Sequence, residues 1–236
     1  MPGRGHRRRI GAAVVGSMAA TVAAGTFALV ALDAEAPVQN DSVHVVPVIE
    51  LPEPRTDGET SFEQALLQRR AERDFLDQPL SLSQLGQLLW AAQGETGDGR
   101  NAPSAGALYP LEIYIAHADG IYHYRPAGHE VAAVSADDIR APLAEAALDQ
   151  RAFHSAPSVI VIAGVNERMA VKYRNRAEQY VLIEVGHAGQ NLLMQAAVLG
   201  IGAVPTGAFH DDDVAELFNL PDGTEPLYLI PVGLPA

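Results

Sequence analysis

Three arginines near residue 70 have the chemistry and spacing to bind a phosphate group. Arg69, Arg70 and Arg73 follow an apolar segment, and side chains three or four residues apart share one face of a helix. Guanidinium groups bind phosphate oxygens through paired hydrogen bonds. The alternative is a solvated helix face on which these arginines pair with Glu72 and Asp74. The residues alone leave both interpretations open.

A second segment has the composition of a ligand-binding turn. Pro103, Ser104, Ala105 and Gly106 belong to a run of small residues that ends at Pro110. Small side chains let the backbone approach a flat ligand, and the backbone amides and the Ser104 hydroxyl can bind the polar edge of a ring system. A tight connection without any ligand explains the same residues equally well.

The chain has no cysteine and no Gly-x-Ser-x-Gly motif, which argues against thiolate and serine-hydrolase chemistry. The acidic run at 210–213 is typical of a helix start, so we expect no metal site.

Capping and hydrophobic patterns predict the elements that position these residues. Ser61 and Ser81, each followed three residues later by Gln, predict capping boxes that begin two amphipathic helices. The other predicted elements are a hairpin of strands 111–116 and 121–124, a central strand at 158–165, a buried helix at 180–199 and a last strand at 227–232. Because strands and helices are mixed without regular alternation, the fold class is α+β.

Composition and charge limit the possible partners. A hydrophobic content of 48% over 236 residues allows one substantial core. Four of the 16 basic and two of the 29 acidic residues lie in 1–36, which leaves 12 basic and 27 acidic residues beyond. Such an acidic surface repels nucleic acid, so no nucleic-acid partner is expected, and an anionic cofactor needs a local cationic pocket.

The N-terminal 36 residues predict export or membrane anchoring. Arginines at 7–9 precede an uncharged run over residues 10–32, which is long enough to span a bilayer, and Ala-Glu-Ala at 34–36 resembles a signal-peptidase site. We expect a periplasmic, extracellular or anchored protein whose membrane contact is confined to this segment. Residues 37–60 are predicted to form a linker and 61–236 the catalytic domain.

Several motifs occur in a fixed order along roughly residues 61–235. They are Arg-Arg-x-x-Arg-x-Phe at 69–75, Leu-Leu-Trp-Ala-Ala-Gln-Gly at 88–94, Pro-Ser-Ala-Gly-Ala-Leu-Tyr-Pro-Leu-Glu at 103–112, Gly-His-x-x-Gln-Asn-Leu-Leu at 186–193, Leu-Gly-Ile-Gly at 199–202 and Pro-Thr-Gly-Ala-Phe at 205–209. In this order they resemble the nitroreductase superfamily, in particular its SagB/ThcOx-type branch of FMN-dependent dehydrogenases that oxidise azoline rings.

The resemblance implies a nitroreductase-like fold, in which a mainly antiparallel sheet is flanked by helices around a buried central helix. It also implies a homodimer with FMN at the subunit interface. The implied contacts are Arg69, Arg70 and Arg73 at the phosphate, Pro103, Ser104, Ala105 and Gly106 against the isoalloxazine ring, and Thr206 and Gly207 near its N5 side. Lys172 and Tyr173, which precede the long predicted helix, match the pair that looks catalytic in azoline-oxidising relatives. Oxidation of an azoline removes a carbon-bound proton and therefore requires a base, and a lysine held out of water beside a tyrosine can act as one. An exposed lysine next to a packed tyrosine is the alternative.

Two departures from the family pattern put FMN retention in doubt. Ala71 stands where the family usually has serine, and the chain ends at Ala236 without the basic tail of some relatives. We expect an FMN enzyme that oxidises a small heterocycle or a peptide azoline. The alternatives are an NAD(P)H-dependent nitroreductase or quinone reductase, and a flavin-poor scaffold in a biosynthetic complex.

Overall fold

The computed structural model describes residues 47–236, so the expectations for the N-terminal segment lie outside the described residues. The strands are β1 (Val48–Glu50), β2 (Glu95–Thr96), β3 (Gly99–Arg100), β4 (Leu111–His117), β5 (Gly120–Arg125), β6 (Glu130–Ser135), β7 (Ser158–Val165), β8 (Gly202–Ala203) and β9 (Thr224–Gly233). The helices are α1 (Phe62–Gln68), α2 (Leu82–Gln93), α3 (Arg140–Ala146), α4 (Arg151–Ser155), α5 (Asn166–Tyr173), α6 (Ala177–Val198) and α7 (Asp211–Leu217), with 3-10 turns η1 (Ala105–Ala107) and η2 (Arg174–Arg176). Within residues 47–236, none of the helices has both the length and the apolar composition needed to cross a bilayer.

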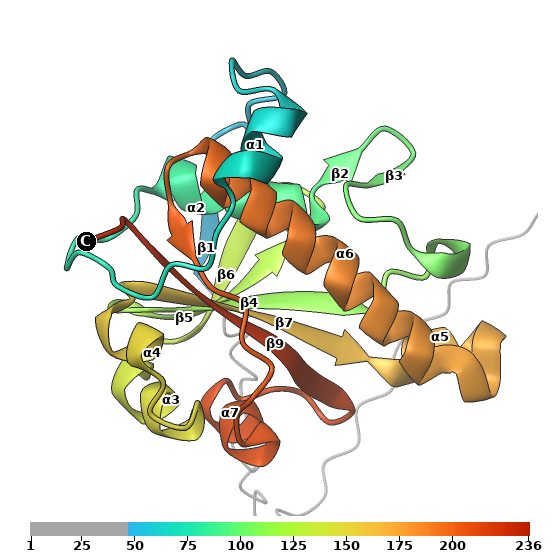
Figure 1. Ribbon diagram of the computed structural model, residues 1–236. Helices are drawn as coiled ribbons and strands as arrows, with labels where there is room; N and C mark the ends of the chain where they lie inside the picture. The colour runs from blue at the N-terminus through green and yellow to red at the C-terminus, as the bar shows by residue number, and fades with distance from the viewer. Residues whose placement is uncertain (1–46) are drawn as a thin grey trace, which may run out of the picture. The chain divides into compact units, whose positions relative to one another are not determined.

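Seven strands form one sheet in the order β1-β6-β5-β4-β7-β9-β8, and all neighbouring strands are antiparallel. The predicted hairpin is the β4–β5 pair, closed by the turn at residues 118–119. Both predicted capping boxes are present, at Ser61 with Gln64 and at Ser81 with Gln84. The α+β class is therefore confirmed (Figure 1).

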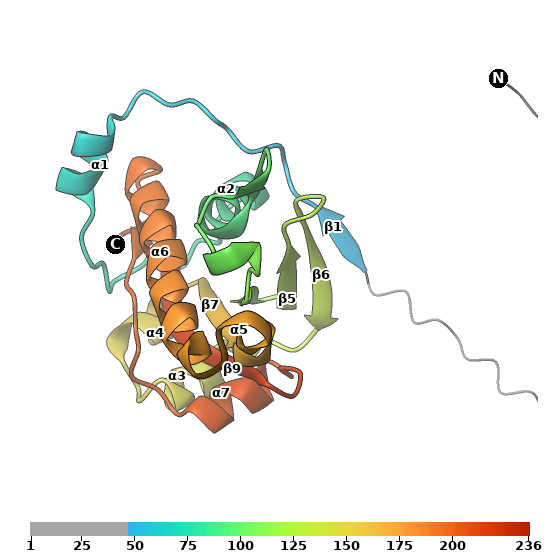
Figure 2. The same cartoon turned by 90° about the vertical axis from the view of Figure 1, so that its right-hand side faces the viewer.

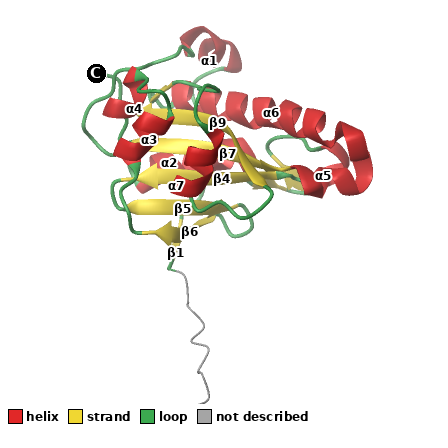
Figure 3. Cartoon of the chain, turned by 90° about the horizontal axis from the view of Figure 1, so that it is seen from below, coloured by secondary structure: helices red, strands yellow, loops and turns green. Residues whose placement is uncertain are grey.

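The sheet is covered by helices on both faces, which explains why β7 is buried from Ser158 to Gly164. Ile160 and Ile162 belong to the core that contains α2 and α6, whereas Val159 and Val161 belong to the core that contains α3, α4 and α7. Side chains alternate between the two faces of a strand, so a central strand between two helical layers is buried throughout. The helices lie on either side of the sheet in Figure 3.

The long helix α6 crosses one face of the sheet and is buried along one side (Figure 1). Val181, Val185 and Ala188 begin its buried stripe, at the spacing of a helix that faces a core. On the other side Leu182 and Ile183 are 51% and 46% exposed. The described chain thus leaves an apolar surface of its central helix in contact with solvent.

The domain begins earlier than the predicted boundary at residue 61. Strand β1 pairs with β6 at the edge of the sheet (Figure 2), and Leu51 is buried in the core. The backbone N–H of Arg55 donates to Gln87 Oε1 at 2.8 Å, and Gln87 Nε2 donates to the Arg55 carbonyl at 3.0 Å. The prediction of a free linker up to residue 60 is wrong from Val48 onward, because this segment supplies a strand and a core side chain.

Candidate active site

The Pro103–Gly106 turn is fixed to the long helix by the carboxyl group of Glu184. The Ser104 hydroxyl donates to Glu184 Oε1 at 3.2 Å, and the backbone N–H of Ala105 donates to the same oxygen at 2.8 Å. The backbone N–H of Tyr109 in turn donates to Ser104 Oγ at 2.8 Å. Glu184 is only 3% exposed, and its Oε2 has no hydrogen-bond partner among residues 47–236.

Gly106 is the contact point between this turn and the predicted catalytic pair. Its φ of +64° lies in the left-handed region that favours glycine. A Cβ atom at this position would lie 2.7 Å from Lys172 Nζ and 2.9 Å from Tyr173 Oη. The structure therefore brings together two segments, 103–106 and 172–173, that are far apart in the sequence.

Lys172 is the single lysine among the 16 basic residues of the chain; all the others are arginines. Its Nζ lies 5.4 Å from the centre of the Tyr173 ring. Arginine stays protonated in proteins, whereas lysine can lose its proton and act as a base. The one lysine of the chain thus lies against the turn. In the single chain the Lys172 side chain is exposed, so it is not held out of water as the sequence analysis expected.

A second network attaches the helix α5, which carries Lys172, to the same loop. Arg168 Nη1 donates to the Tyr109 carbonyl at 2.6 Å, and its Nη2 donates to Glu112 Oε1 at 2.6 Å. His123 Nε2 lies 2.8 Å from the other oxygen of Glu112. Because Tyr109 and Glu112 flank the end of the loop, this network fixes α5 relative to the turn.

The two carboxyl groups that hold the loop have opposite pKa shifts. Burial, the largest influence, raises the pKa of Glu184 despite the hydrogen bonds from Ala105 and Ser104. Burial also acts to raise the pKa of Glu112, but the hydrogen bonds and charges of His123 and Arg168 together hold that pKa below its ordinary value. Glu112 is therefore an ionised anchor, and Glu184 resists ionisation.

The predicted phosphate site has a different geometry from the one expected. Helix α1 ends at Gln68, and Arg69 has extended backbone angles, so the prediction that Arg69 and Arg73 share a helix face is wrong. The chain instead runs beside β8, where the N–H of Glu72 donates to the Ala203 carbonyl at 3.1 Å. This backbone pairing replaces the next turn of helix.

Arg69 and Arg70 line a groove of about 210 Å³ with residues at the C-terminal end of α6, and Arg73 lies outside its lining. None of the three arginines takes part in the ion pairs found within residues 47–236. The alternative of a pairing with Glu72 and Asp74 is not observed within residues 47–236: Asp74 is bound by Arg151, and Glu72, which also lines the groove, forms none of these ion pairs. The guanidinium groups are thus available for an external anion.

Thr206 and Gly207 follow β8 on the way to α7. The backbone of Thr206 exchanges hydrogen bonds with Leu229 of β9 at 2.8 and 3.0 Å, and its side chain is buried. Gly207 is exposed, and a Cβ there would have open space around it. Neither residue lines the arginine groove, and neither do residues 103–106.

The match with known proteins agrees with this fold. Residues 66–234 match the model of the Nitroreductase family. The chain belongs to this family. A protein of Methanocaldococcus jannaschii that is named a nitroreductase is 39% identical over 183 residues, covering 74% of this chain and 91% of that protein. A solved nitroreductase-named structure from Ralstonia eutropha superimposes with a TM-score of 0.72 at 31% identity, covering 80% of this chain and 90% of that one. The predicted nitroreductase-like fold is confirmed.

More distant relatives of this nitroreductase-family chain are named for peptide products. The Microcin B17-processing protein McbC of Escherichia coli is 27% identical over 161 residues, covering 61% of this chain. The Trifolitoxin operon protein TfxC of Rhizobium leguminosarum is 25% identical over 192 residues, covering 71% of this chain. The matched regions span 58% and 54% of these two proteins, respectively.

Within one chain of this nitroreductase-family protein, the two parts of the predicted FMN site lie at different levels of α6. The turn contacts Glu184, whereas the arginine groove is lined by α6 from Leu193 onward. At a rise of about 1.5 Å per residue, these levels are roughly 13 Å apart along the helix. The single chain therefore does not close the arginines and the turn around one shared pocket.

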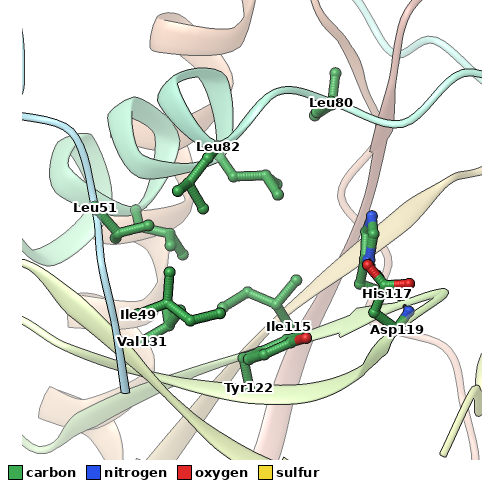
Figure 4. A pocket seen from close by; sticks show the side chains of 11 residues that line it. Ile49, Leu51, Leu80, Leu82, Ile115, His117, Asp119, Tyr122 and Val131 are labelled. Carbon is green, nitrogen blue, oxygen red and sulfur yellow. Dashed lines mark hydrogen bonds and ion pairs between the residues drawn. The ribbon is translucent and has the colours of Figure 1, made fainter. Parts of the chain in front are cut away.

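An apolar pocket of about 220 Å³ lies elsewhere, between α2 and the sheet (Figure 4). Leucine and isoleucine side chains from β1, α2 and β4, and from the segments next to β1 and α2, make up most of its lining, and His117 with Asp119 lies at one end. His117 Nδ1 is 3.5 Å from Asp119 Oδ2. None of the predicted site residues lines this pocket, so it is separate from the candidate active site.

Sequence analysis missed the residues that support the site, namely Glu112, His123, Arg168 and Glu184. A signal was present for Glu184, because it is a carboxylate within an otherwise apolar stripe of a helix predicted to be buried. A buried charge of this kind needs partners. No comparable signal marked Arg168, whose partners lie more than 50 residues away in the sequence.

Proposed function

We propose that this chain is an FMN-dependent oxidoreductase of the SagB type that removes two electrons and two hydrogens from a small heterocycle or a peptide azoline. The observation that supports it most directly is the position of the single lysine, which lies with Tyr173 against Gly106. Dehydrogenation at a ring carbon needs a proton acceptor, and a lysine can fill that role where an arginine cannot.

The described residues fit an FMN molecule. Arg69 and Arg70 have no carboxylate partner among the ion pairs of residues 47–236 and would hold the phosphate. The small residues of the turn, with Gly106 in a left-handed conformation, would let the backbone approach the ring. When bound, FMN supplies the acceptor for two electrons and a hydrogen. Ala71 offers no hydroxyl to the phosphate, so the arginines provide most of the charge at that end.

In this proposal the residues of the chain act on the proton and on position. Lys172 accepts the proton from the substrate carbon, and the Tyr173 hydroxyl beside it orients the substrate. Glu184 fixes the position of the turn and Arg168 fixes that of α5, so that the Lys172 amine would stay next to the ring of the substrate. Ordering of these groups before substrate binds lowers the cost of reaching the reactive geometry.

A second copy of the chain completes the site in this proposal. The arginine groove and the turn at residues 103–106 lie at different levels of α6. When two copies pack along this helix, the groove of one copy can meet the turn of the other. Leu182 and Ile183 on the exposed side of α6, with Leu66 and Leu67 on α1, offer apolar surface for that contact. Packing there would also remove water from Lys172, which is exposed in the single chain.

The second candidate is an NAD(P)H-dependent nitroreductase or quinone reductase on the same scaffold. The 39% identical relative from Methanocaldococcus jannaschii, which is named a nitroreductase, favours this reaction. In that case Lys172 would contribute charge rather than accept a proton. The two reactions differ in which small molecule reduces the flavin.

An absorption spectrum of the purified protein, followed by anaerobic titration, tests the proposal. We expect FMN as the extracted chromophore and bleaching of the bound flavin by a thiazoline peptide. Rapid bleaching by NADH with no response to the thiazoline would instead support the reductase. A colourless protein that does not take up added FMN would contradict both reactions. It would support the third alternative, a flavin-poor scaffold in a biosynthetic complex.

A further inference from the structure

Three basic side chains border the Lys172 end of the candidate site. Lys172, Arg174 and Arg176 lie within five residues, in a chain whose acidic residues outnumber its basic residues by 29 to 16. All three are exposed, and none takes part in an ion pair with another described residue. We call these three side chains the 172–176 cationic cluster.

Aromatic contacts connect this cluster to the turn. The guanidinium carbon of Arg176 lies 5.3 Å from the centre of the Tyr180 ring, and the Tyr180 ring packs edge-on against Tyr173 at 4.8 Å. The Tyr173 hydroxyl in turn reaches the Cβ position of Gly106. Ring packing of this kind limits the freedom of the arginine side chain. Arg176 is therefore held near the site rather than projecting freely into solvent.

Arg174 occupies a strained backbone conformation. Its φ is +48° and its ψ is −118°, at the C-cap of α5, where glycine would be relaxed and a side chain is unfavourable. Its guanidinium makes no hydrogen bond or ion pair with the rest of residues 47–236 that would offset this strain. This position therefore presents an exposed guanidinium that has no partner within residues 47–236 and can bind a ligand of opposite charge.

We propose that the 172–176 cationic cluster binds a carboxylate of the substrate, with Arg174 and Arg176 holding the charge beside the amine of Lys172. Guanidinium groups match a carboxylate with paired hydrogen bonds, and a cationic region on an acidic surface draws in anions. The inference rests on the proposed function only for placing the reacting ring at Lys172. The phosphates of a nicotinamide dinucleotide could supply a similar charge, and the experiment separates the two sources.

Calorimetric titration of the FMN-loaded, full-length protein tests this proposal with 2-methylthiazoline-4-carboxylate and its carboxamide, which differ mainly in charge. We expect the wild type to bind the carboxylate roughly tenfold more tightly than the amide. The double variant Arg174→Gly with Arg176→Gln should lose this preference. A matched double variant, Arg125→Gln with Arg140→Gln, removes two positive charges that pair with Glu130 and Asp138 elsewhere, and it should keep the preference.

The single variant Arg174→Gly separates binding from folding. It should raise the thermal unfolding midpoint because glycine relaxes the backbone, and it should weaken carboxylate binding several-fold. A lowered midpoint with unchanged binding would show that Arg174 is structural and would overturn its role in the proposal.

Two further outcomes would overturn the proposal as a whole. In the first, the wild type binds the carboxylate and the carboxamide with equal affinity. In the second, the double variant Arg174→Gly with Arg176→Gln changes only the binding of NADH or NADPH. Reduction of the flavin by the amide, with equal binding of both probes, would reject this inference while the proposed function stands. Tight binding of the carboxylate by the cluster without any flavin reduction would support this inference and reject azoline oxidation.

Discussion

The turn at residues 103–106 and the segment at residues 69–73 differ in how the fold holds them. Hydrogen bonds that the turn donates to a buried carboxyl group fix its position, and a second network through Arg168 fixes the helix that packs on it. The arginine segment is held by its backbone, next to β8, and its guanidinium groups have no partner among the described ion pairs. The turn is thus held through side chains, whereas the guanidinium groups of the arginine segment are not held by any of the described ion pairs.

This difference corresponds to different tasks. A group that takes part in bond breaking must be positioned within a fraction of an ångström, which favours residues fixed by surrounding contacts. An anion such as phosphate can be bound by flexible cations, because the attraction depends weakly on angle. We therefore expect substitutions near the turn to change the rate of turnover and the stability of the fold. We expect substitutions in the arginine segment to change the affinity for the cofactor.

The largest expected effect is on turnover in the variant Lys172→Arg. Arginine keeps the positive charge but does not release its proton, so general-base catalysis should fall by a factor of roughly 100 to 10,000 while FMN stays bound. Stopped-flow reduction of the bound flavin by a thiazoline substrate measures this rate. An unchanged rate would remove Lys172 from the proton transfer.

The next largest effect concerns FMN affinity. Arg69→Gln combined with Arg70→Gln should weaken FMN binding about 100-fold, since two charge-assisted contacts are lost. Quenching of flavin fluorescence on titration gives the dissociation constant. Arg73→Gln is the matched control: it removes the same charge outside the groove and should change the constant much less. Equal effects of both changes would mean that the groove does not define the phosphate site.

Removal of the buried carboxyl group tests the ordered region. Glu184→Ala should lower the free energy of unfolding by about 2 kcal/mol, because the N–H of Ala105 and the Ser104 hydroxyl lose their acceptor. Chemical denaturation measures this change. Little change in stability would mean that the turn is held by other contacts.

The variant Glu184→Gln adds a dependence on pH. The pKa of Glu184 is raised by burial above its ordinary value of 4.5, so its stabilising contribution is complete below that pH and is lost as the pH rises through the raised pKa. The wild type should therefore lose stability relative to Glu184→Gln as the pH rises from about 4.5. A constant difference between the two proteins over that range would contradict the burial of this group.

The smallest expected effect comes from Arg168→Gln. The pKa of Glu112 is held below its ordinary value of 4.5, so its stabilising contribution is present above that pH and is lost as the pH falls through the lowered pKa. Loss of the Arg168 charge should make this acid-induced loss smaller and reduce turnover about tenfold through a displaced α5. Chemical denaturation at several pH values between about 3 and 6 measures the change in the acid-induced loss of stability.

The sequence predicted the elements whose signals are local. The capping boxes at Ser61 and Ser81 were confirmed because their hydrogen bonds join residues only three positions apart. Strand β7 was confirmed because its own run of β-branched residues marks a buried strand whichever strands it pairs with. The edge strand β1 was missed, since it is only three residues long and its partner β6 lies about 80 residues away. Contacts at such separation leave little trace in a single sequence.

The candidate site was predicted in its parts and not in its arrangement. The resemblance supplied Lys172, Tyr173 and Gly106, and the structure places these three in contact. The arginines do not share a helix face as expected, because α1 ends at Gln68 and the chain then pairs with β8. Tertiary pairing of this kind overrides a pattern that is compatible with a helix.

The central claim is that the arginine groove of one copy and the Lys172 turn of another form each FMN site. It is tested most directly by mixing two inactive proteins, the Arg69→Gln, Arg70→Gln variant and the Lys172→Arg variant, and measuring turnover after subunit exchange. A shared site predicts recovery of about a quarter of wild-type activity, because half of the dimers then contain one intact site. Complete exchange without any recovered activity would contradict the claim, since both halves of the site would then belong to one chain.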